Sequence, residues 1–168
     1  MENNYSAAQI LATAHDVLAE LRERFPQHRD AFAKVHFQTS RRMTSAAGKA
    51  NCRTGAIKLS EAFFSDPTNA KESLRNTVLH EIAHIVSPPQ RGHSAHGRRW
   101  RATFVSFGGS GERCHQMKLA QGFKRKERTV VKCGCGRCGR EISLGPVQLR
   151  RAKAGADYRH RDCEYRRR

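Results

Sequence analysis

Near the middle of the 168-residue chain lies the segment Val78-Leu79-His80-Glu81-Ile82-Ala83-His84-Ile85-Val86. Its apolar residues recur at helical spacing, which predicts a helix from about residue 70 to residue 86. Pro88 and Pro89 follow and prevent the helix from continuing. With about 3.6 residues per turn, two histidines four positions apart share one face of a helix and can bind a single Zn²⁺.

Glu81 lies beside the two histidines on the surface of the same helix. A carboxylate in that place can accept a proton from zinc-bound water without itself binding the ion. Glu81 is therefore the expected general base of a catalytic zinc site that includes His80 and His84.

A catalytic zinc ion needs a third protein ligand. The extended motif H-E-x-x-H-x-x-G-x-x-H is absent, because Ser87 and Gln90 occupy its glycine position and its last histidine position. The remaining candidates are His93, His96, Glu112 and Glu127. We favour His96, which precedes a predicted helix and is followed by Gly97, a residue that permits close approach; His93 is the alternative.

The flanking segments predict a mixture of helices and short strands. An amphipathic helix is expected over residues 10–25, with Ser6 available as its cap. Alternating residues predict strands over 34–39, 49–52 and 56–59, the last two joined by a hairpin at Thr54-Gly55. Another helix is expected from residue 98 to residue 107, with Trp100, Phe104 and Phe107 on its apolar face.

His80-Glu81-x-x-His84, followed after a loop by His96-Gly97-x-x-Trp100, resembles the SprT-like (SprT/Spartan) zinc metalloproteases. Residues 45–50 and the strand at 56–60 resemble the segment that precedes the metal-binding helix in that family. Cys114-His115-Gln116 falls where members carry a similar short histidine motif. The resemblance covers about residues 5–165, and its specific parts are the metal motif and a zinc ribbon that closes many members.

The resemblance implies an α+β fold: a small gluzincin-like metallopeptidase domain over residues 1–126, with helices packed on a short sheet, and a C-terminal zinc ribbon. It implies that His80, His84 and His96 bind the catalytic Zn²⁺ and that Glu81 is the general base. His115 near the cleft is either functional or a buried structural histidine. In the eukaryotic branch of the family the substrates are proteins crosslinked to DNA or tightly held on it.

Cysteines cluster in residues 127–168, the expected zinc-ribbon module. Cys135-x-x-Cys138-Gly139 has the form of a zinc knuckle, and His160-x-x-Cys163 supplies a second half. These four residues predict a closed structural site for a second Zn²⁺, with Cys133 as the alternate ligand for Cys135 or Cys138. The family often carries cysteine where this chain has His160; a redox-active cysteine pair is the competing interpretation.

The formal charge of +17 is concentrated in the second half of the chain, with +2 over residues 1–90 and +15 over residues 91–168. Arginine dominates this excess, and its guanidinium group binds phosphate through two parallel hydrogen bonds. We therefore expect nucleic acid, with DNA favoured, as a partner beside the protein substrate; a solubilising basic tail is the alternative. The expected contacts are Arg125, Lys126, Arg150, Arg151, Arg166 and Arg167.

No stretch of about 20 apolar residues is present, so no membrane partner is expected. The N-terminal residues MENNYSAAQI lack the pattern of a secretory signal, which predicts an intracellular protein, cytoplasmic or nucleoid-associated. Three functions remain open. The chain is a zinc metalloendopeptidase recruited to nucleic acid, a nucleic-acid-binding zinc-ribbon protein with a catalytically idle helix, or a hydrolase acting on something other than peptide.

Overall fold

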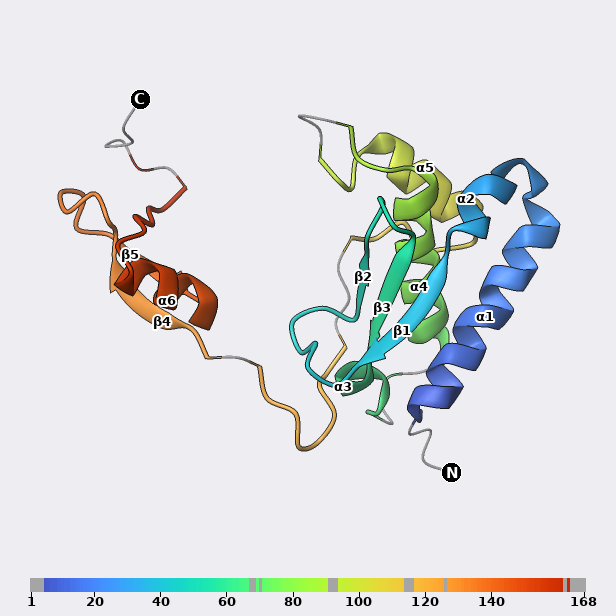
Figure 1. Cartoon of the computed structure of the whole chain (residues 1–168), viewed down its shortest axis with the longest axis horizontal. Helices are drawn as coiled ribbons and strands as arrows, with labels where there is room; N and C mark the ends of the chain where they lie inside the picture. The colour runs from blue at the N-terminus through green and yellow to red at the C-terminus, as the bar shows by residue number, and fades with distance from the viewer. Residues whose placement is uncertain are drawn as a thin grey trace. The chain divides into compact units, whose positions relative to one another are not determined.

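The computed structural model describes residues 5–66, 69, 71–90, 94–113, 117–125, 127–161 and 163. Contacts divide the chain into two compact units, Met1–Lys124 and Arg125–Arg168. The first unit contains helices and a three-stranded sheet, and the second contains a two-stranded sheet and a helix (Figure 1), so the expected α+β class is confirmed. Within the described residues, no helix combines the length and the apolar character needed to span a membrane.

The sheet of the first unit is small and mixed. Its strands are β1 (His36–Ser40), β2 (Gly48–Ala50) and β3 (Ala56–Ser60). β3 lies in the centre, parallel to β1 and antiparallel to β2, and β2 is therefore an edge strand. The predicted hairpin is confirmed, with residues 51–55 joining β2 to β3 and Gly55 in the left-handed region at φ 78°.

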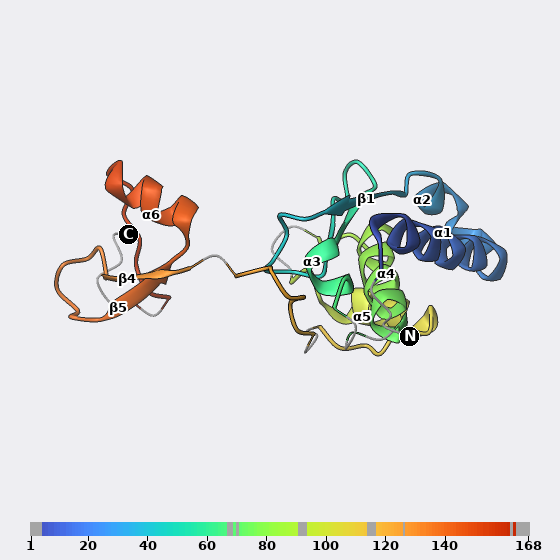
Figure 2. The same cartoon turned by 90° about the horizontal axis from the view of Figure 1, so that it is seen from below.

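Among the described residues, helices cover one face of this sheet. Ile57 and Leu59 on β3 are fully buried, whereas Lys58 between them is exposed. Helices α1 (Ala7–Arg24) and α4 (Lys71–Val86) pack against each other and against this sheet, α1 on β1 and α4 on β2 and β3 (Figures 1 and 2). The alternation of burial along β3 thus fixes which side of the sheet receives α4.

Helix α1 begins and ends where its sequence predicts. Ser6 and Gln9 form a capping box, in which each side chain accepts a hydrogen bond from the other residue's backbone N–H. The helix ends at Arg24, just before Pro26. Its buried residues are Ile10, Ala14, Val17, Leu18 and Leu21. This stripe supplies one wall of the core.

Helix α5 (Arg98–Ser106) completes the core against α4. Trp100 and Phe104 are buried, four positions apart on one face. The chain turns sharply after α5, and Gly109 passes so close to Phe104 that a β-carbon there would lie 1.9 Å from the aromatic ring. Glycine at 109 therefore allows the chain to cross the ring of Phe104.

Three short helical segments were not predicted. They are the 3-10 helix η1 (Pro26–His28), α2 (Arg29–Ala33) and α3 (Glu61–Phe64). Each spans about one turn, too short to show a helical period in the sequence. Two of them nonetheless place core aromatics, because Phe32 in α2 and Phe63 and Phe64 in α3 are fully buried.

The second unit has little apolar core. Strands β4 (Thr129–Lys132) and β5 (Glu141–Leu144) pair antiparallel, and helix α6 (Pro146–Lys153) follows. Among its described residues, the buried side chains are those of Leu144 and two cysteines, Cys133 and Cys163. A unit with so few buried side chains needs another source of stability.

Candidate metal centres

Three histidine rings converge at one point of the first unit. His80 and His84 lie one turn apart on α4, and His96 lies immediately before α5. The Nε2 atom of His96 is 3.1 Å from Nε2 of His84 and 3.2 Å from Nε2 of His80. The favoured third residue, His96, thus joins the helical pair.

The separations of these nitrogens fit a metal ion better than hydrogen bonds. A ring nitrogen carries one proton or one lone pair, so Nε2 of His96 cannot form two full hydrogen bonds to its neighbours. Tetrahedral zinc with Zn–N distances of about 2.0–2.1 Å places its ligand nitrogens about 3.3 Å apart. The observed 3.1 and 3.2 Å are close to this separation.

Two of the three histidines, His84 and His96, are in the protonation state that a metal ion requires. Burial, with a smaller effect of the neighbouring His96, lowers the pKa of His84 to about 4. Burial and the nearby Arg113 guanidinium also lower the pKa of His96. Since both imidazoles are then neutral at pH 7, their lone pairs remain available to an ion.

Trp100 holds the three rings in place. Its indole is 3% exposed, and its ring centroid lies 4.6 Å from that of His80, 5.3 Å from that of His84 and 4.5 Å from that of His96. Its Nε1–H also donates a hydrogen bond of 3.4 Å to the backbone carbonyl of His80. The aromatic wall therefore limits the orientations that the ligand rings can adopt.

Glu81 is buried beside this group, with 6% of its surface exposed. Burial raises the pKa of its carboxyl group from 4.5 to about 7, although a hydrogen bond from the backbone of Ala50 favours the charged form. A carboxyl group with this pKa can both take up and release a proton near neutral pH. This is the property that a general base and acid needs.

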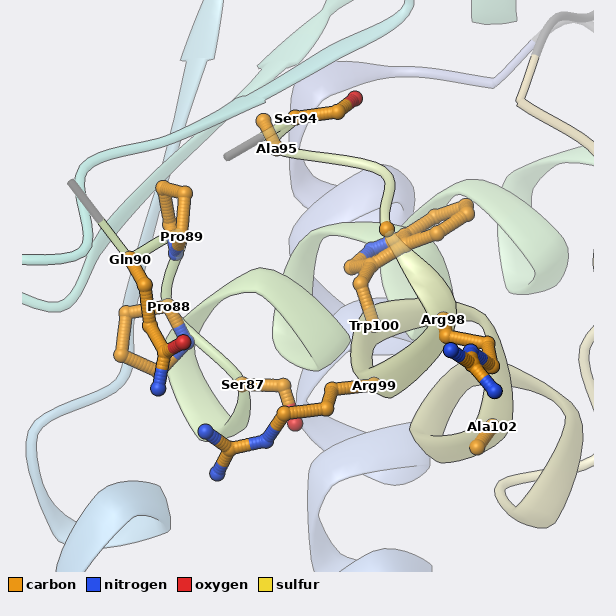
Figure 3. A pocket seen from close by; sticks show the side chains of 11 residues that line it. Ser87, Pro88, Pro89, Gln90, Ser94, Ala95, Arg98, Arg99, Trp100 and Ala102 are labelled. Atoms are coloured by element: carbon orange, nitrogen blue, oxygen red, sulfur yellow. The ribbon is translucent and has the colours of Figure 1, made fainter. Parts of the chain in front are cut away.

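Two cavities border the site. One of about 530 Å³ has His96 in its wall, together with Arg101, Glu112 and Arg113. A second, of about 540 Å³, has Pro88 and Pro89 on one side and Trp100 on the other (Figure 3). Trp100 lines both cavities. Space for a substrate therefore adjoins the histidine group.

Comparison with known families identifies the first unit. The model of the SprT-like family matches residues 14–132, which is more than half of the chain and includes the three histidines and Glu81. The chain belongs to the SprT-like family. The resemblance seen in the sequence is thus confirmed, and the family is generally associated with zinc metalloprotease activity. A search of curated proteins found no match.

The SprT-like protein carries a second group of metal-binding side chains just beyond the matched region. Cys133, Cys138, His160 and Cys163 each offer one ligand atom, and these atoms lie within 4.8 Å of one another. The Sγ atoms of Cys133 and Cys163 are 3.8 Å apart. Two thiolates on tetrahedral zinc, with Zn–S distances of about 2.3 Å, lie about 3.8 Å apart, whereas a disulfide bond measures about 2.05 Å.

His160 gives independent support for an ion in this group. Its Nε2 atom is buried and has no hydrogen-bond partner among the described residues. A buried polar atom without a partner costs stability unless a ligand satisfies it. Zinc coordinated by His160 and three thiolates would do so and would supply the stability that the small core lacks.

The group differs in one member from the set favoured in the sequence. Cys135 was the expected ligand with Cys133 as its alternate, and the structure brings Cys133 into the group instead. The thiol of Cys135 accepts hydrogen bonds from the backbone N–H groups of Arg137 and Cys138, at 3.5 and 3.4 Å. These bonds, that of Arg137 first, lower the pKa of Cys135 to about 6. The Cys135 thiol also interacts with the side chains of Cys133 and Cys138, so it lies beside the group without belonging to it.

Some of the residues expected at a nucleic-acid interface can be placed. Arg125, Arg150 and Arg151 are exposed, and none forms an ion pair within the part of the chain that the structure describes. Arg150 and Arg151 lie in the last turn of α6. The other expected contacts, Lys126, Arg166 and Arg167, lie outside the described residues, as do His93 and His115.

Other features of the site were missed in the sequence. Trp100 was expected on the apolar face of a helix and as part of the family motif, but its contact with all three histidine rings was not predicted. Cys52 is half-buried, and its thiol donates a 3.3 Å hydrogen bond to the backbone carbonyl of His84, a contact that the sequence does not show. The hydrogen bond from Ala50 to Glu81 depends on tertiary packing and leaves no local signal.

Proposed function

We propose that this SprT-like protein is a zinc-dependent endopeptidase and that Glu81 is its general base. The observation that carries the proposal is the convergence of three histidine side chains, of which His84 and His96 have lowered pKa values, beside a buried glutamate whose pKa is about 7. Three imidazoles and an open position are the ligand set of a catalytic zinc site. The same observation argues against a purely structural site, which normally has four protein ligands.

The proposed mechanism assigns a task to each side chain. His80, His84 and His96 would hold the ion, and Trp100 packs against all three of their rings. When bound, Zn²⁺ supplies Lewis acidity, which polarises a peptide carbonyl and makes water more acidic. Glu81 accepts the proton of the attacking water and then delivers it to the departing amine nitrogen. Its pKa of about 7 suits both transfers.

For the substrate, we propose proteins bound or crosslinked to DNA. The charge of +15 over residues 91–168 supports this, together with the exposed arginines of α6. The proposed Cys₃His zinc site, formed by Cys133, Cys138, His160 and Cys163, would hold that basic unit in its folded form. DNA binding would then bring the peptidase to its substrate without a sequence-specific protein contact.

The test compares the wild type with Glu81→Gln and with Glu72→Gln, an exposed glutamate on the same helix. Each protein is loaded with zinc and incubated with a basic protein, alone and bound to DNA. We expect Glu81→Gln to retain zinc and to lose about 100-fold or more in cleavage rate, because the proton acceptor is gone. Glu72→Gln should cleave as the wild type does.

The exposed arginines of the second unit also support another function, nucleic-acid binding by a protein whose His80–His84 helix has no catalytic activity. Both functions predict DNA binding that weakens with salt. They differ in cleavage. Equal behaviour of the wild type and Glu81→Gln toward the DNA-bound protein would reject the peptidase and leave the binding function.

A further inference from the structure

The edge strand β2 runs alongside α4 at the position of Glu81. Ser60 N–H donates to the carbonyl of Ala47, and Asn51 N–H donates to that of Ala56, so residues 47 and 51 face the central strand β3. Alternate residues of an antiparallel strand face the same way. The backbone groups of Gly48 and Ala50 consequently face away from β3, off the edge of the sheet.

At this edge the backbone of Ala50 hydrogen-bonds to Glu81. The bond links the carboxylate to a strand outside its own helix. A carboxylate that accepts a backbone N–H is restricted in direction as well as in charge. Glu81 is thus oriented by β2 and not by α4 alone.

Gly48, two residues earlier on β2, leaves the space that Glu81 occupies. A β-carbon at Gly48 would lie 2.6 Å from Cγ, 2.7 Å from Oε1 and 2.9 Å from Cδ of Glu81. Gly48 does not have a positive φ angle, so residues other than glycine can adopt its backbone conformation. Glycine is required here by the space that the glutamate fills, and not by the backbone angles.

The effect of adding a methyl group at a glycine depends on whether the atoms that it meets can move, and Gly109 and Gly48 differ in this respect. At Gly109 the nearest atoms belong to the fully buried ring of Phe104, which has no room to move. At Gly48 all three of the nearest atoms belong to the flexible Glu81 side chain. A methyl group at 48 can therefore be accommodated by turning Glu81 away, with little disturbance of either backbone.

We infer that Gly48 is a positioning residue, which together with the N–H of Ala50 forms a seat in the edge strand that holds the Glu81 carboxylate. The inference rests on the proposed function for its catalytic consequence. The seat itself is a statement about contacts and can be tested without any substrate. Substitution of Gly48 should lower the rate of catalysis and leave the stability of the protein unchanged. Substitution of a purely structural glycine would lower the stability as well.

The catalytic test uses zinc-loaded full-length Gly48→Ala and a basic protein substrate bound to DNA. We expect unchanged zinc content, a melting temperature close to that of the wild type, an unchanged KM and a kcat lower by about 100-fold, the cost of a misplaced catalytic group. Gly145→Ala, where the nearest neighbour of an added methyl is 3.7 Å away, is the matched control and should keep the wild-type kcat. A wild-type kcat in Gly48→Ala would overturn the inference. So would a loss of stability as large as that of Gly109→Ala.

The second test measures amide hydrogen exchange and needs no activity. Ala50 N–H faces off the edge, so its protection depends on Glu81, whereas Asn51 N–H is bonded to Ala56 at 2.8 Å. We expect faster exchange at Ala50, with Asn51 unchanged, in both Gly48→Ala and Glu81→Ala. Unchanged exchange at Ala50 in Gly48→Ala would refute the seat. If the wild type has no peptidase activity but these exchange rates change as expected, the proposed function fails while the seat remains.

Discussion

The indole of Trp100 stacks on the ring of His84, with the two centroids 5.3 Å apart and the planes inclined by 24°. The same indole meets His80 and His96 nearly edge-on, at 66° and 90°. One buried side chain therefore contacts three ligand rings that come from two segments of the chain. Their geometry is prepared by packing before an ion binds.

Replacement of Trp100 by alanine should weaken the histidine site and the fold together. We expect zinc affinity to fall by about 10–100-fold, as for the loss of other groups that orient ligands. The free energy of unfolding should fall by about 3–5 kcal/mol. Trp100→Phe, which keeps an aromatic ring but loses the Nε1–H bond to His80, should lose less of both. Chelator competition and urea unfolding measure the two quantities, and wild-type zinc affinity in Trp100→Ala would contradict the role assigned to the indole.

Metal analysis should find two zinc ions per chain, because the two ligand groups lie in different units. His96→Ala should remove one ion and Cys138→Ser the other, and the double variant should hold none. His15→Ala is the control, since His15 is exposed on α1 and belongs to neither group. A stoichiometry of one in the wild type would eliminate one of the proposed sites.

The four cysteines of the second unit should differ in their importance for its metal. Cys133→Ser should lose the ion of this unit, because Cys133 belongs to the convergent group. Cys135→Ser should keep the ion and lose the interactions of the Cys135 thiol, among them the hydrogen bonds from Arg137 and Cys138. Zinc content of the two variants, measured after dialysis, decides the point. The reverse result would make Cys135 the ligand that the sequence favoured.

The buried carboxyl of Glu81 should contribute less to the stability of the metal-free protein as pH rises. Its pKa is raised from 4.5 to about 7 on folding, so between these values the native state binds more protons than the unfolded state. The stability that Glu81 contributes is full below about pH 4.5 and is lost progressively up to about pH 7, whereas the lowered pKa of His84 acts in the opposite direction in both proteins. Glu81→Gln cannot ionise, and its stability relative to the wild type should therefore increase across this window. Denaturant unfolding in chelator at pH 5 and pH 8 tests this; exposed Glu72→Gln should show no such trend.

Salt dependence should show whether α6 contacts phosphate. The double variant Arg150→Gln/Arg151→Gln should reduce the slope of log K against log salt by about 1.8 for duplex DNA if each arginine neutralises one phosphate. Arg53→Gln, an exposed arginine of the first unit, serves as the control. An unchanged slope in the double variant would remove Arg150 and Arg151 from the interface.

The elements that the sequence predicted share strong local signals. The capping box at Ser6 and Gln9, the apolar stripe of α1 and the stop at Pro26 agree with one another, and the helix follows them. The spacing of His80 and His84 likewise placed both rings on one face. His96 could be favoured because its neighbours predicted a helix start, which the structure confirms at Arg98.

The features that could not be predicted depend on long-range packing. No local pattern of residues 26–33 or 61–64 shows that these single turns bury aromatic side chains. The parallel pairing of β1 with β3 brings together segments twenty positions apart, as for Phe37 and Ile57. The choice between Cys133 and Cys135 depends on which thiol faces His160 and Cys163, and sequence spacing fits either.

The position of His96 outside α4 also gives the ion a mechanical role. His84 and His96 are twelve residues apart, and the intervening chain leaves α4 through Pro88 and Pro89. An ion bound by both ties the two ends of this segment together in the folded protein, and because the ion binds only the assembled site it favours the folded state. Removal of the metal would therefore release the connection between α4 and the start of α5, which carries Trp100. Loss of the ion would at the same time loosen the packing of Trp100 against the histidine rings.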